Sequence, residues 1–482
     1  MSRAIIIGTG MAGKLTAKVI SPYVDEVIMI ERNKLDVGKE VRKGIPQGNH
    51  FHALLSRGYQ IINNLFPKTD ELMKLHNGNK IDMGQDFTWY HCGIWKKKHH
   101  MDIETYVSSR PLLDWILLQQ VKEIKNVKIL DNTRVVNLIY NKIYNQVIGV
   151  KITKEGNLIP TELTANIVID TSGRSTKTEK WFEDLGIGVP KSKEVKVDLK
   201  YASRYFEMPD ELKNKLDYTL IYPKPPYSSN IGFIYPMEGK IGITLSSMFS
   251  EIDISTEEGF KDHIMNLDHP LLSEIFPELI PISNIRTFSI SGSEWKMYHK
   301  LKNFPKGFLV MGDAFVRVNP IYGQGMTSAA IQAETLAKAL RRTTKLEEIH
   351  KKYYKMVPSK VGLIWKLSTA EDLRYSPVEG KRSLYIKIFH WYSKMILETS
   401  YDPQIYKQFM KVFNFIAPEI SLFKPTFVIR LMYMKLFGEP NNNYNLDEEI
   451  TILKKHKILR DMQIIENNGI QPKEEEKIIS VL

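Results

Sequence analysis

Unbroken runs of apolar residues near the start of the chain predict buried parallel strands. Residues 4–7 and 27–30 show no polar alternation, which is typical of strands that are covered on both faces. Residues 14–20 between them have the pattern of a helix, and a second helix is predicted at 54–65. Together these elements predict the strand–helix–strand unit from which open α/β sheets are built.

Further along, the hydrophobic pattern changes twice. A helix is predicted at 105–124, and it is followed by short strands at 127–130, 135–140, 147–152 and 167–169. The stretch 189–288 alternates apolar or aromatic positions with polar ones, as antiparallel strands do. A buried strand at 308–311 and a helix at 326–341 return to the first pattern, and the chain after residue 345 is mainly helical.

A glycine-rich turn joins the first predicted strand to the first helix. Gly8, Gly10 and Gly13 form a G-x-G-x-x-G pattern. Met11 and Ala12 stand between its last two glycines. The first glycine permits a tight turn, the second lets the backbone approach a pyrophosphate, and the third lets the helix pack closely on the strand. The helix N-terminus then offers N–H groups and partial positive charge to phosphates.

An acidic residue follows the second predicted strand. Glu31 comes 18 residues after Gly13, where a carboxylate accepts hydrogen bonds from a ribose diol, and Arg32 is assigned to the same site. Glu31 alone does not distinguish FAD from NAD. Asp170 and Gly173, which follow another predicted strand, are expected beside the same dinucleotide.

A third segment narrows the choice to a flavin. Asp313 ends a buried strand, where its carboxylate can accept hydrogen bonds from ribityl hydroxyls. The loop that follows runs from Pro320 through Gly323 to Gly325, and a helix begins at Met326. The N-terminus of that helix would stabilise the negative charge that reduced flavin carries near N1. The order and spacing of the three segments therefore predict FAD.

Composition and charge limit the alternatives. The 482 residues carry a formal net charge of +12, but the lysines are scattered and no nucleic-acid-binding module is found. Part of the positive charge would serve anionic cofactors, and contact with an anionic membrane surface stays open. Cys92 is the single cysteine, which excludes an internal disulfide and fits a reducing compartment. No signal peptide or transmembrane helix is predicted, so a cytoplasmic location is expected.

These motifs resemble the class A flavin-dependent monooxygenases, which share the p-hydroxybenzoate hydroxylase type of fold. Further matches lie at 42–47 with His50 and His52, and at 109–113. Residues 371–375, with Glu379 and Gly380, are similar to a bacterial subgroup that includes polyketide and terpenoid epoxidases. The resemblance extends to about residue 435.

The resemblance implies a composite α/β fold. A Rossmann-like FAD-binding domain would comprise 1–75, 101–188 and 289–345. An inserted, mainly antiparallel β-sheet domain of 76–100 and 189–288 would bind the substrate. A helical C-terminal region, 346–482, would end in a frayed tail.

The resemblance also implies roles for single residues. Arg42 and Arg110 would contact the FAD phosphates or ribose, for which a bidentate guanidinium is suited. Asp170 and Gly173 would lie near the pyrophosphate and in the path of the nicotinamide cofactor. His50 and His52 lack further metal ligands at a usable spacing, so no metal is predicted. Both His50 and His52 are expected to be hydrogen-bonded pocket residues rather than catalytic bases.

The implied activity is insertion of one oxygen atom from O₂, through a C4a-hydroperoxyflavin, into a hydrophobic arene or alkene. Either hydroxylation or epoxidation would result, with NADPH or NADH as electron donor. Phe315 to Arg317 and Met326-Thr327 stand where aromatic hydroxylases carry a histidine and an asparagine. Asp170-Thr171 replaces their usual Asp-Gly pair, which leaves the docking of the nicotinamide open, so a separate flavin reductase remains an alternative source of electrons. Candidates for the apolar pocket are Phe206, Tyr222, Phe233, Tyr235, Met237 and Trp295.

Three other functions stay open. An isoprenoid reductase or cyclase uses similar FAD motifs. A flavin-dependent halogenase would carry a W-x-W-x-I-P string and a reactive lysine, and this chain has no such string. A non-enzymatic alternative is a peripheral membrane or scaffold flavoprotein, because the predicted helices at 385–396 and 427–437 are basic and aromatic.

Overall fold

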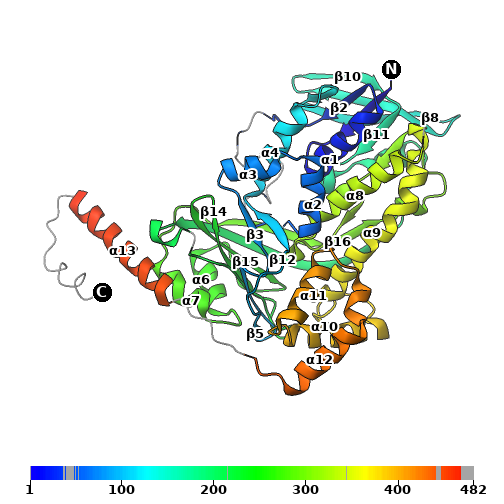
Figure 1. Cartoon of the computed structure of the whole chain (residues 1–482). Coiled ribbons are helices and arrows are strands. Elements are labelled where there is room, and N and C mark those ends of the chain that lie inside the picture. Colours follow the sequence, from blue (N-terminus) through cyan, green and yellow to red (C-terminus); the bar gives the residue numbers. More distant parts are fainter. Residues whose placement is uncertain are drawn as a thin grey trace.

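The structure is a computed structural model that describes residues 2–35, 38, 48, 50–52, 54–213, 215–343, 345–440 and 447–467. Arg42, the rest of the 42–47 segment and the expected frayed tail beyond residue 467 lie outside these residues. Figure 1 shows a first part that contains β1 (Arg3–Ile7), β2 (Glu26–Ile30) and β11 (Ile167–Asp170) at one end, a second part with a large β-sheet beside it, and a group of helices below.

A five-stranded parallel sheet forms the centre of the first part. Its strand order is β17-β11-β1-β2-β7. The strands are β1 (Arg3–Ile7), β2 (Glu26–Ile30), β7 (Val127–Leu130), β11 (Ile167–Asp170) and β17 (Phe308–Val310). Four of them, β1, β2, β11 and β17, are almost entirely buried, as their apolar sequences predict for strands covered on both faces.

Helices and a small second sheet cover this parallel sheet. The helices are α1 (Met11–Ile20), α4 (Arg110–Lys122) and α8 (Gly325–Leu340), with α2 (Ser56–Leu65), α3 (Thr69–Leu75) and α5 (Thr178–Asp184) beside them. A buried ion pair of 2.5 Å between Lys14 and Asp114 joins α1 to α4. The small antiparallel sheet consists of β8 (Thr133–Asn141), β9 (Gln146–Lys154) and β10 (Asn157–Thr164).

An eight-stranded sheet forms the second part, in the order β18-β16-β12-β15-β14-β13-β4-β5. The strands are β4 (Phe87–His91), β5 (Ile94–Trp95), β12 (Ser192–Glu207), β13 (Tyr218–Ile221), β14 (Ile231–Met237), β15 (Lys240–Met248), β16 (Arg286–Lys296) and β18 (Val316–Arg317). All neighbours are antiparallel except β13 and β4. Helices α6 (Glu257–Met265) and α7 (Leu271–Ile275) pack against it, and a ribbon of β3 (Asn79–Asp82) and β6 (Glu104–Val107) lies beside it.

The helices after residue 345 divide among three places. Helix α9 (Ile349–Asp372) packs along α8 on the first part of the molecule. Helices α10 (Leu384–Glu398), α11 (Pro403–Phe413) and α12 (Pro425–Phe437), with the 3₁₀ turn η10 (Glu419–Phe423), form a separate bundle. Helix α13 (Asp447–Asn467) returns to the eight-stranded sheet and packs on α7, far from α12 in Figure 1.

The predicted composite α/β fold is confirmed, but several boundaries differ. The predicted helix at 105–124 is wrong in its first turn, because Thr105, Tyr106 and Val107 belong to β6. β-Branched and aromatic residues suit a strand there, and the helix starts only after Ser109, whose side chain accepts a hydrogen bond from Leu112 N–H.

Two domain boundaries also differ from expectation. β16 and β18 extend the antiparallel sheet beyond residue 288, into residues assigned to the FAD-binding domain. The stretch 189–288 also contains α6 and α7, two helices that the alternating sequence pattern did not predict. The C-terminal region is not one unit, because α9 completes the first part and α13 the second.

Candidate functional site

The three predicted cofactor segments meet because their strands are neighbours. β1 pairs with β11, and β11 pairs with β17, all in parallel. Ile7 lies opposite Asp170, and Asp170 lies opposite Val310. The loops that follow the three strands therefore leave the same edge of the sheet, where ligands of open α/β sheets bind.

Glycines let these loops touch. A Cβ on Gly8 would lie 3.1 Å from the carbonyl oxygen of Thr171, and one on Gly312 would lie 2.7 Å from Cβ of Ala12. The first segment is thereby in contact with both of the others. Gly13 does not line the site. It holds α1 against the preceding turn, because a Cβ there would lie 2.1 Å from the carbonyl oxygen of Gly8.

A cavity of about 750 Å³ opens where the loops meet. The predicted site residues that line it are Gly8, Gly10, Met11, Ala12, Glu31, Arg32, His52, Arg110, Gly173, Asp313, Pro320, Gly323, Gly325 and Met326. Its described lining carries seven basic side chains and two acidic ones. This balance favours an anionic ligand.

Two helices begin at this cavity without a side-chain cap. Helix α1 begins after Gly10, and α8 begins after Gln324, and neither has an acidic residue in its first turn. Their first N–H groups are therefore left for a ligand. A Cβ built on Gly10 or Gly325 meets no atom within 4 Å, so the backbone there borders open space. The geometry suits phosphates at α1 and an electron-rich ring edge at α8.

Glu31 closes one end of the cavity. Its carboxylate accepts hydrogen bonds from the Thr9 hydroxyl at 2.7 Å, from Thr9 N–H at 3.2 Å and from Asn33 N–H at 3.1 Å. These contacts fix the carboxylate between the first two strands. The oxygens still face the cavity, where a ribose diol could donate to them.

Asp313 lies among arginines at the centre of the cavity. Its side chain is accessible from the cavity, while the surrounding protein raises its pKa by desolvation. The guanidinium groups of Arg317, Arg110 and Arg174 act in the opposite direction. Arg174 packs over the ring of Phe288, 5.7 Å from its centroid. The carboxylate is thus balanced by positive charge and remains able to accept hydrogen bonds.

His50 stands at the wall between the two parts of the molecule. Its Nδ1 is 2.8 Å from the hydroxyl of Ser203 on β12. Its Nε2 is buried and has no hydrogen-bond partner among the described residues. Burial lowers the pKa of His50 to about 4, so the ring is neutral near pH 7. An unsatisfied nitrogen at a cavity wall is a group that a bound ligand would satisfy.

Asp170, like Gly13, is a described candidate that does not line the cavity. It is fully buried, and its carboxylate accepts hydrogen bonds from Ser172, Thr176 and Thr178. It organises the turn that carries Gly173 and Arg174, both of which line the cavity. The reason is geometric, since the last side chain of a buried strand points into the fold while the next residues turn outward.

A second, apolar cavity of about 230 Å³ adjoins the first. Both are lined by Phe51, Tyr201, Pro320 and Gly323, so the loop before α8 separates them. Of the pocket candidates, Tyr222 and Phe233 line it. The other four do not: Phe206, Tyr235 and Met237 pack in the core of the second part, and Trp295 packs in that of the first.

The bundle of α10–α12 forms one wall of the apolar cavity. Phe389, Ile396 and Leu397 of α10 face it, together with Phe409 and Phe413 of α11. The pattern of the C-terminal sequence showed helices but gave no sign that their inner faces complete a pocket. Contacts between distant segments of the chain, such as those of Trp89 with Phe409 and Phe413, create this wall.

A few polar groups interrupt the apolar lining. His91 stacks on Trp89 with ring centroids 5.2 Å apart, and its Nδ1 has no hydrogen-bond partner among the described residues. Burial lowers the pKa of His91 well below its usual range, so its ring is neutral. Glu371 also lines this cavity, and Arg374 pairs with it at 2.5 Å. Such groups can orient a polar substituent on an otherwise apolar ligand.

A buried carboxyl supports the loop between the cavities. Asp372 accepts hydrogen bonds from Asn319 at 2.7 Å and from the Tyr322 hydroxyl at 2.9 Å. Burial nevertheless raises the pKa of Asp372 to about 7. The motif Glu371-Asp372 therefore reaches both the apolar lining and the loop before α8.

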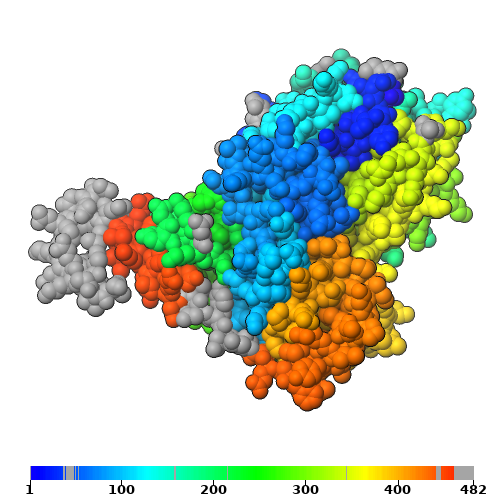
Figure 2. All heavy atoms as spheres, viewed as in Figure 1, coloured from blue at the N-terminus to red at the C-terminus, as the bar shows by residue number. Residues whose placement is uncertain are grey.

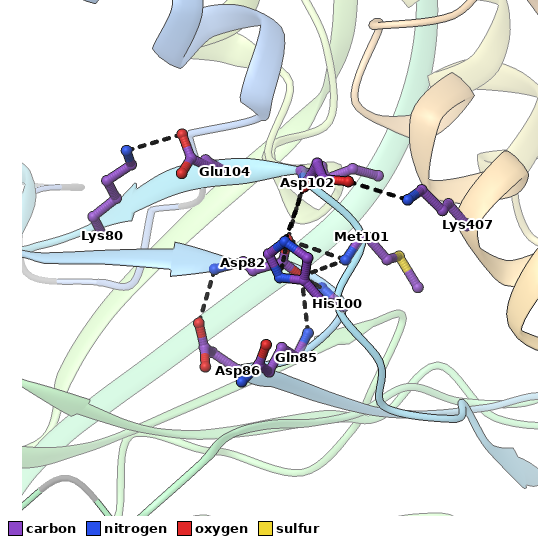
Figure 3. Close-up of polar contacts among 11 residues, drawn as sticks. Lys80, Asp82, Gln85, Asp86, His100, Met101, Asp102, Glu104 and Lys407 are labelled. Atoms are coloured by element: carbon purple, nitrogen blue, oxygen red, sulfur yellow. Dashed lines mark hydrogen bonds and ion pairs between the residues drawn. The ribbon is translucent and has the colours of Figure 1, made fainter.

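Asp82 holds the β3–β6 ribbon that forms another wall of the apolar cavity. Its carboxylate accepts hydrogen bonds from the N–H groups of Gly84, Gln85, Met101 and Ile103, at 2.9–3.2 Å. Figure 3 shows His100 beside this carboxylate. The described residues contain no group of three His, Cys, Asp or Glu side chains that could hold a metal ion.

Comparisons with known structures show that this chain shares its fold with flavin-dependent enzymes. The flavin-dependent brominase Bmp2 superposes with a TM-score of 0.64 at 14% identity, over 90% of this chain and 99% of the brominase. PqsL, a probable FAD-dependent monooxygenase from Pseudomonas aeruginosa, gives 0.58 at 16% identity, over 77% of this chain and 97% of PqsL. At such identities the likeness shows the fold alone, and it confirms the predicted class A flavin monooxygenase type of fold.

Comparison of sequences identifies a related protein but does not assign the chain to a family. Protein Rv3254 of Mycobacterium tuberculosis is 28% identical over 350 residues, which cover 70% of this chain and 73% of that protein. No family model matches the chain.

Proposed function

We propose that the chain is an FAD-dependent monooxygenase that acts on a hydrophobic arene or alkene. The observation that carries this proposal is the apolar cavity next to the cofactor cavity, with the loop of Pro320 and Gly323 between them. The cofactor in the first cavity and the apolar substrate in the second would come together at that loop.

The residues present fit FAD. Gly10 and the uncapped N-terminus of α1 suit the pyrophosphate, and Glu31 suits the ribose diol. Asp313 suits the ribityl hydroxyls, and the N-terminus of α8 suits the pyrimidine edge of the ring. When bound and reduced, FAD supplies the electrons that activate O₂.

The protein would contribute binding, water exclusion and orientation. Aromatic rings such as Trp89, Phe233 and Phe413 keep the second cavity apolar, which would exclude water from the space where oxygen is transferred. His91 is neutral, so it can exchange a hydrogen bond with a substrate hydroxyl without bringing a charge into the pocket. At α8, partial positive charge from the helix would stabilise developing anionic charge.

The proposal includes a reduced nicotinamide as electron donor, NADPH or NADH, with a separate reductase as the alternative. Arg134, Arg174 and Lys177 line the open cavity beside the turn after β11 and could receive its phosphates. We also propose a cytoplasmic location. Among the described residues, no helix is long and apolar enough to cross a bilayer.

The brominase likeness makes a halogenase the second candidate. It is disfavoured because no lysine stands among the described residues that line the apolar cavity. A reductase or cyclase on an isoprenoid would use the same apolar space.

Anaerobic reduction of the flavin by NADH and by NADPH, with a small set of arenes and polyenes, tests the proposal. We expect one class of compound to accelerate reduction and, once air is admitted, to gain a single oxygen atom by mass spectrometry. A requirement for halide would favour the halogenase, and product formed without O₂ would favour the reductase or cyclase. A colourless protein that cannot be reconstituted with FAD would refute all three.

A further inference from the structure

The outer surface of the α10–α12 bundle is unusually apolar. Among the described residues, 22 large apolar side chains are exposed, and 12 of them lie between residues 384 and 437. A soluble surface normally scatters such side chains singly. This concentration therefore marks an interaction surface.

The exposed residues follow helical spacing on α10. Leu384, Tyr385, Ile388 and Trp391 are exposed, and Trp391 retains 63% of its accessible surface. These positions are i, i+1, i+4 and i+7, which share one side of a helix. The other side, with Phe389 and Leu397, lines the apolar cavity, while Met395 and Ile396 in the last turn pack inside the bundle.

Helix α12 repeats this arrangement. Ile429, Met432, Tyr433 and Leu436 are exposed at i, i+3, i+4 and i+7. Its inner residues Phe427 and Leu431 pack with α10 and α11 in one buried cluster. We call the four exposed residues of α10 and these four of α12 the outer apolar face. Figure 2 shows the bundle, in gold and orange, forming the lower end of the molecule.

The turn η10 connects the two helices through stacked rings. Tyr392 of α10 stacks on Phe423 at 4.9 Å between centroids, with planes 13° apart. Phe423 is itself 56% exposed. The two helices therefore pack together in one bundle, and their exposed residues do not complete any core.

The segment that carries this face is basic. Residues 381–437 contain nine Lys or Arg and three Asp or Glu. Asp402 is paired with Arg430, and Glu398 with Lys435. Lys387 and Lys424 are exposed and form no ion pair with a described residue.

We propose that the outer apolar face binds the surface of an anionic lipid membrane. Tryptophan, tyrosine and lysine on an amphipathic helix are typical of membrane-surface binding. Protein interfaces, by contrast, are depleted of lysine. The positive charge complements phospholipid headgroups, and the apolar residues reach the acyl boundary below them.

The inner side of the same bundle walls the apolar cavity, through Phe389, Ile396 and Leu397. Membrane docking would thus bring the cavity wall to the bilayer, from which an apolar substrate could enter. This last step rests on the proposed monooxygenase function. The docking itself does not, because it is measured without turnover.

Co-sedimentation of the full chain with phosphatidylcholine vesicles, with and without phosphatidylserine, tests the proposal. We expect binding to the anionic vesicles that weakens as salt is raised. Trp391→Ser combined with Leu436→Ser should lower the vesicle affinity at least about tenfold. The matched control Tyr144→Ser with Ile159→Ser changes two equally exposed residues elsewhere and should leave the affinity unchanged.

Charge is tested separately. Lys387→Gln with Lys424→Gln should lower affinity for anionic vesicles about 25-fold, at about fivefold for each lysine. Lys125→Gln with Lys302→Gln, two exposed lysines outside the bundle, is the control.

Three results would overturn the proposal. One is the absence of vesicle binding by the wild-type chain. Another is equal binding by the wild type and the Trp391→Ser, Leu436→Ser variant. The third is a wild-type dimer in sedimentation velocity that this variant dissociates, without vesicle binding, because the face would then belong to a second copy. Flavin absorbance of each variant separates these results from failure of the cofactor site.

Discussion

At the scale of single residues, Glu31 connects the fold to the proposed cofactor. Its carboxylate orders Thr9 in the glycine-rich turn and also faces the cavity. Glu31→Ala should therefore weaken FAD retention, and it should lower the free energy of unfolding by about 1–3 kcal/mol because charged hydrogen bonds are lost. Flavin absorbance after gel filtration measures retention.

Asp313→Ala is a second test of the cofactor site, since Asp313 lines the cavity. Its side chain makes no hydrogen bond to another described residue. The substitution should reduce retention with little loss of stability. Full flavin content in either variant would contradict the assigned role of that carboxylate.

Asp372 makes a prediction about pH. Its pKa is about 7 in the folded chain against 3.8 for an exposed carboxyl. Between these values the folded state keeps a proton that the unfolded state has lost, so this group lowers the free energy of unfolding as pH rises. Asp372→Asn removes that dependence. Relative to the wild type, the variant should gain stability as the pH rises from about 4 to about 7 in urea unfolding. If the free energies of unfolding of the wild type and the variant changed in parallel with pH, Asp372 would not titrate in this range.

Single-residue roles could be predicted where backbone geometry dictates them. Gly8, Gly10 and Gly13 occupy the positions that the strand–turn–helix unit requires. Asp170 was misplaced because the sequence does not show which side of a strand end faces the cavity. His50 was predicted as a pocket residue, but its hydrogen bond to Ser203 depends on a strand 153 positions away.

At the scale of elements, two glycines of one turn should behave differently. Gly13→Ala places a Cβ against the carbonyl oxygen of Gly8 and should destabilise the chain by about 2 kcal/mol or more. Gly10→Ala meets no atom and has φ of −68°, so stability should stay the same or rise by about 0.4–1 kcal/mol. Its Cβ should nonetheless obstruct the pyrophosphate.

Thermal unfolding and flavin titration separate these effects. We expect Gly10→Ala to fold normally and to bind FAD weakly. Tight FAD binding by Gly10→Ala would argue against a pyrophosphate at this turn.

The β3–β6 ribbon depends on one carboxylate. Asp82→Ala removes the acceptor for four backbone N–H groups and should cost about 1.5–3 kcal/mol in urea unfolding. Asp102→Asn is the control, because Asp102 is 76% exposed at its side chain and asparagine tolerates its positive φ. It should change stability by less than about 0.5 kcal/mol. Equal effects in both variants would show that Asp82 does not hold the ribbon.

At the scale of the whole molecule, α13 belongs to the eight-stranded sheet rather than to the bundle that precedes it. Leu453 is 1% exposed and packs in the core beneath that sheet, whereas Leu459 is 42% exposed. Leu453→Asp should cost about 2–4 kcal/mol and release α13, and Leu459→Asp should have little effect.

Limited proteolysis measures the release of α13 directly. We expect early cleavage of the C-terminal helix in Leu453→Asp and retention of FAD, since the cofactor cavity lies on the other part of the chain. Resistance to protease equal to that of Leu459→Asp would mean that the packing of Leu453 contributes little.

The strand–turn–helix unit, the three predicted cofactor segments and the division into parallel and antiparallel sheets could all be predicted from the amino-acid sequence. These features depend on local hydrophobic periodicity and on the few residues that tight turns accept, so they can be read along the chain. Three features became visible only in the folded chain: Phe51 and Tyr201 line both cavities, the C-terminal helices wall the apolar one, and an apolar face remains outside. Such surfaces arise from contacts between distant segments, and an apolar helical stripe has the same pattern whether it packs on a core, lines a pocket or remains exposed.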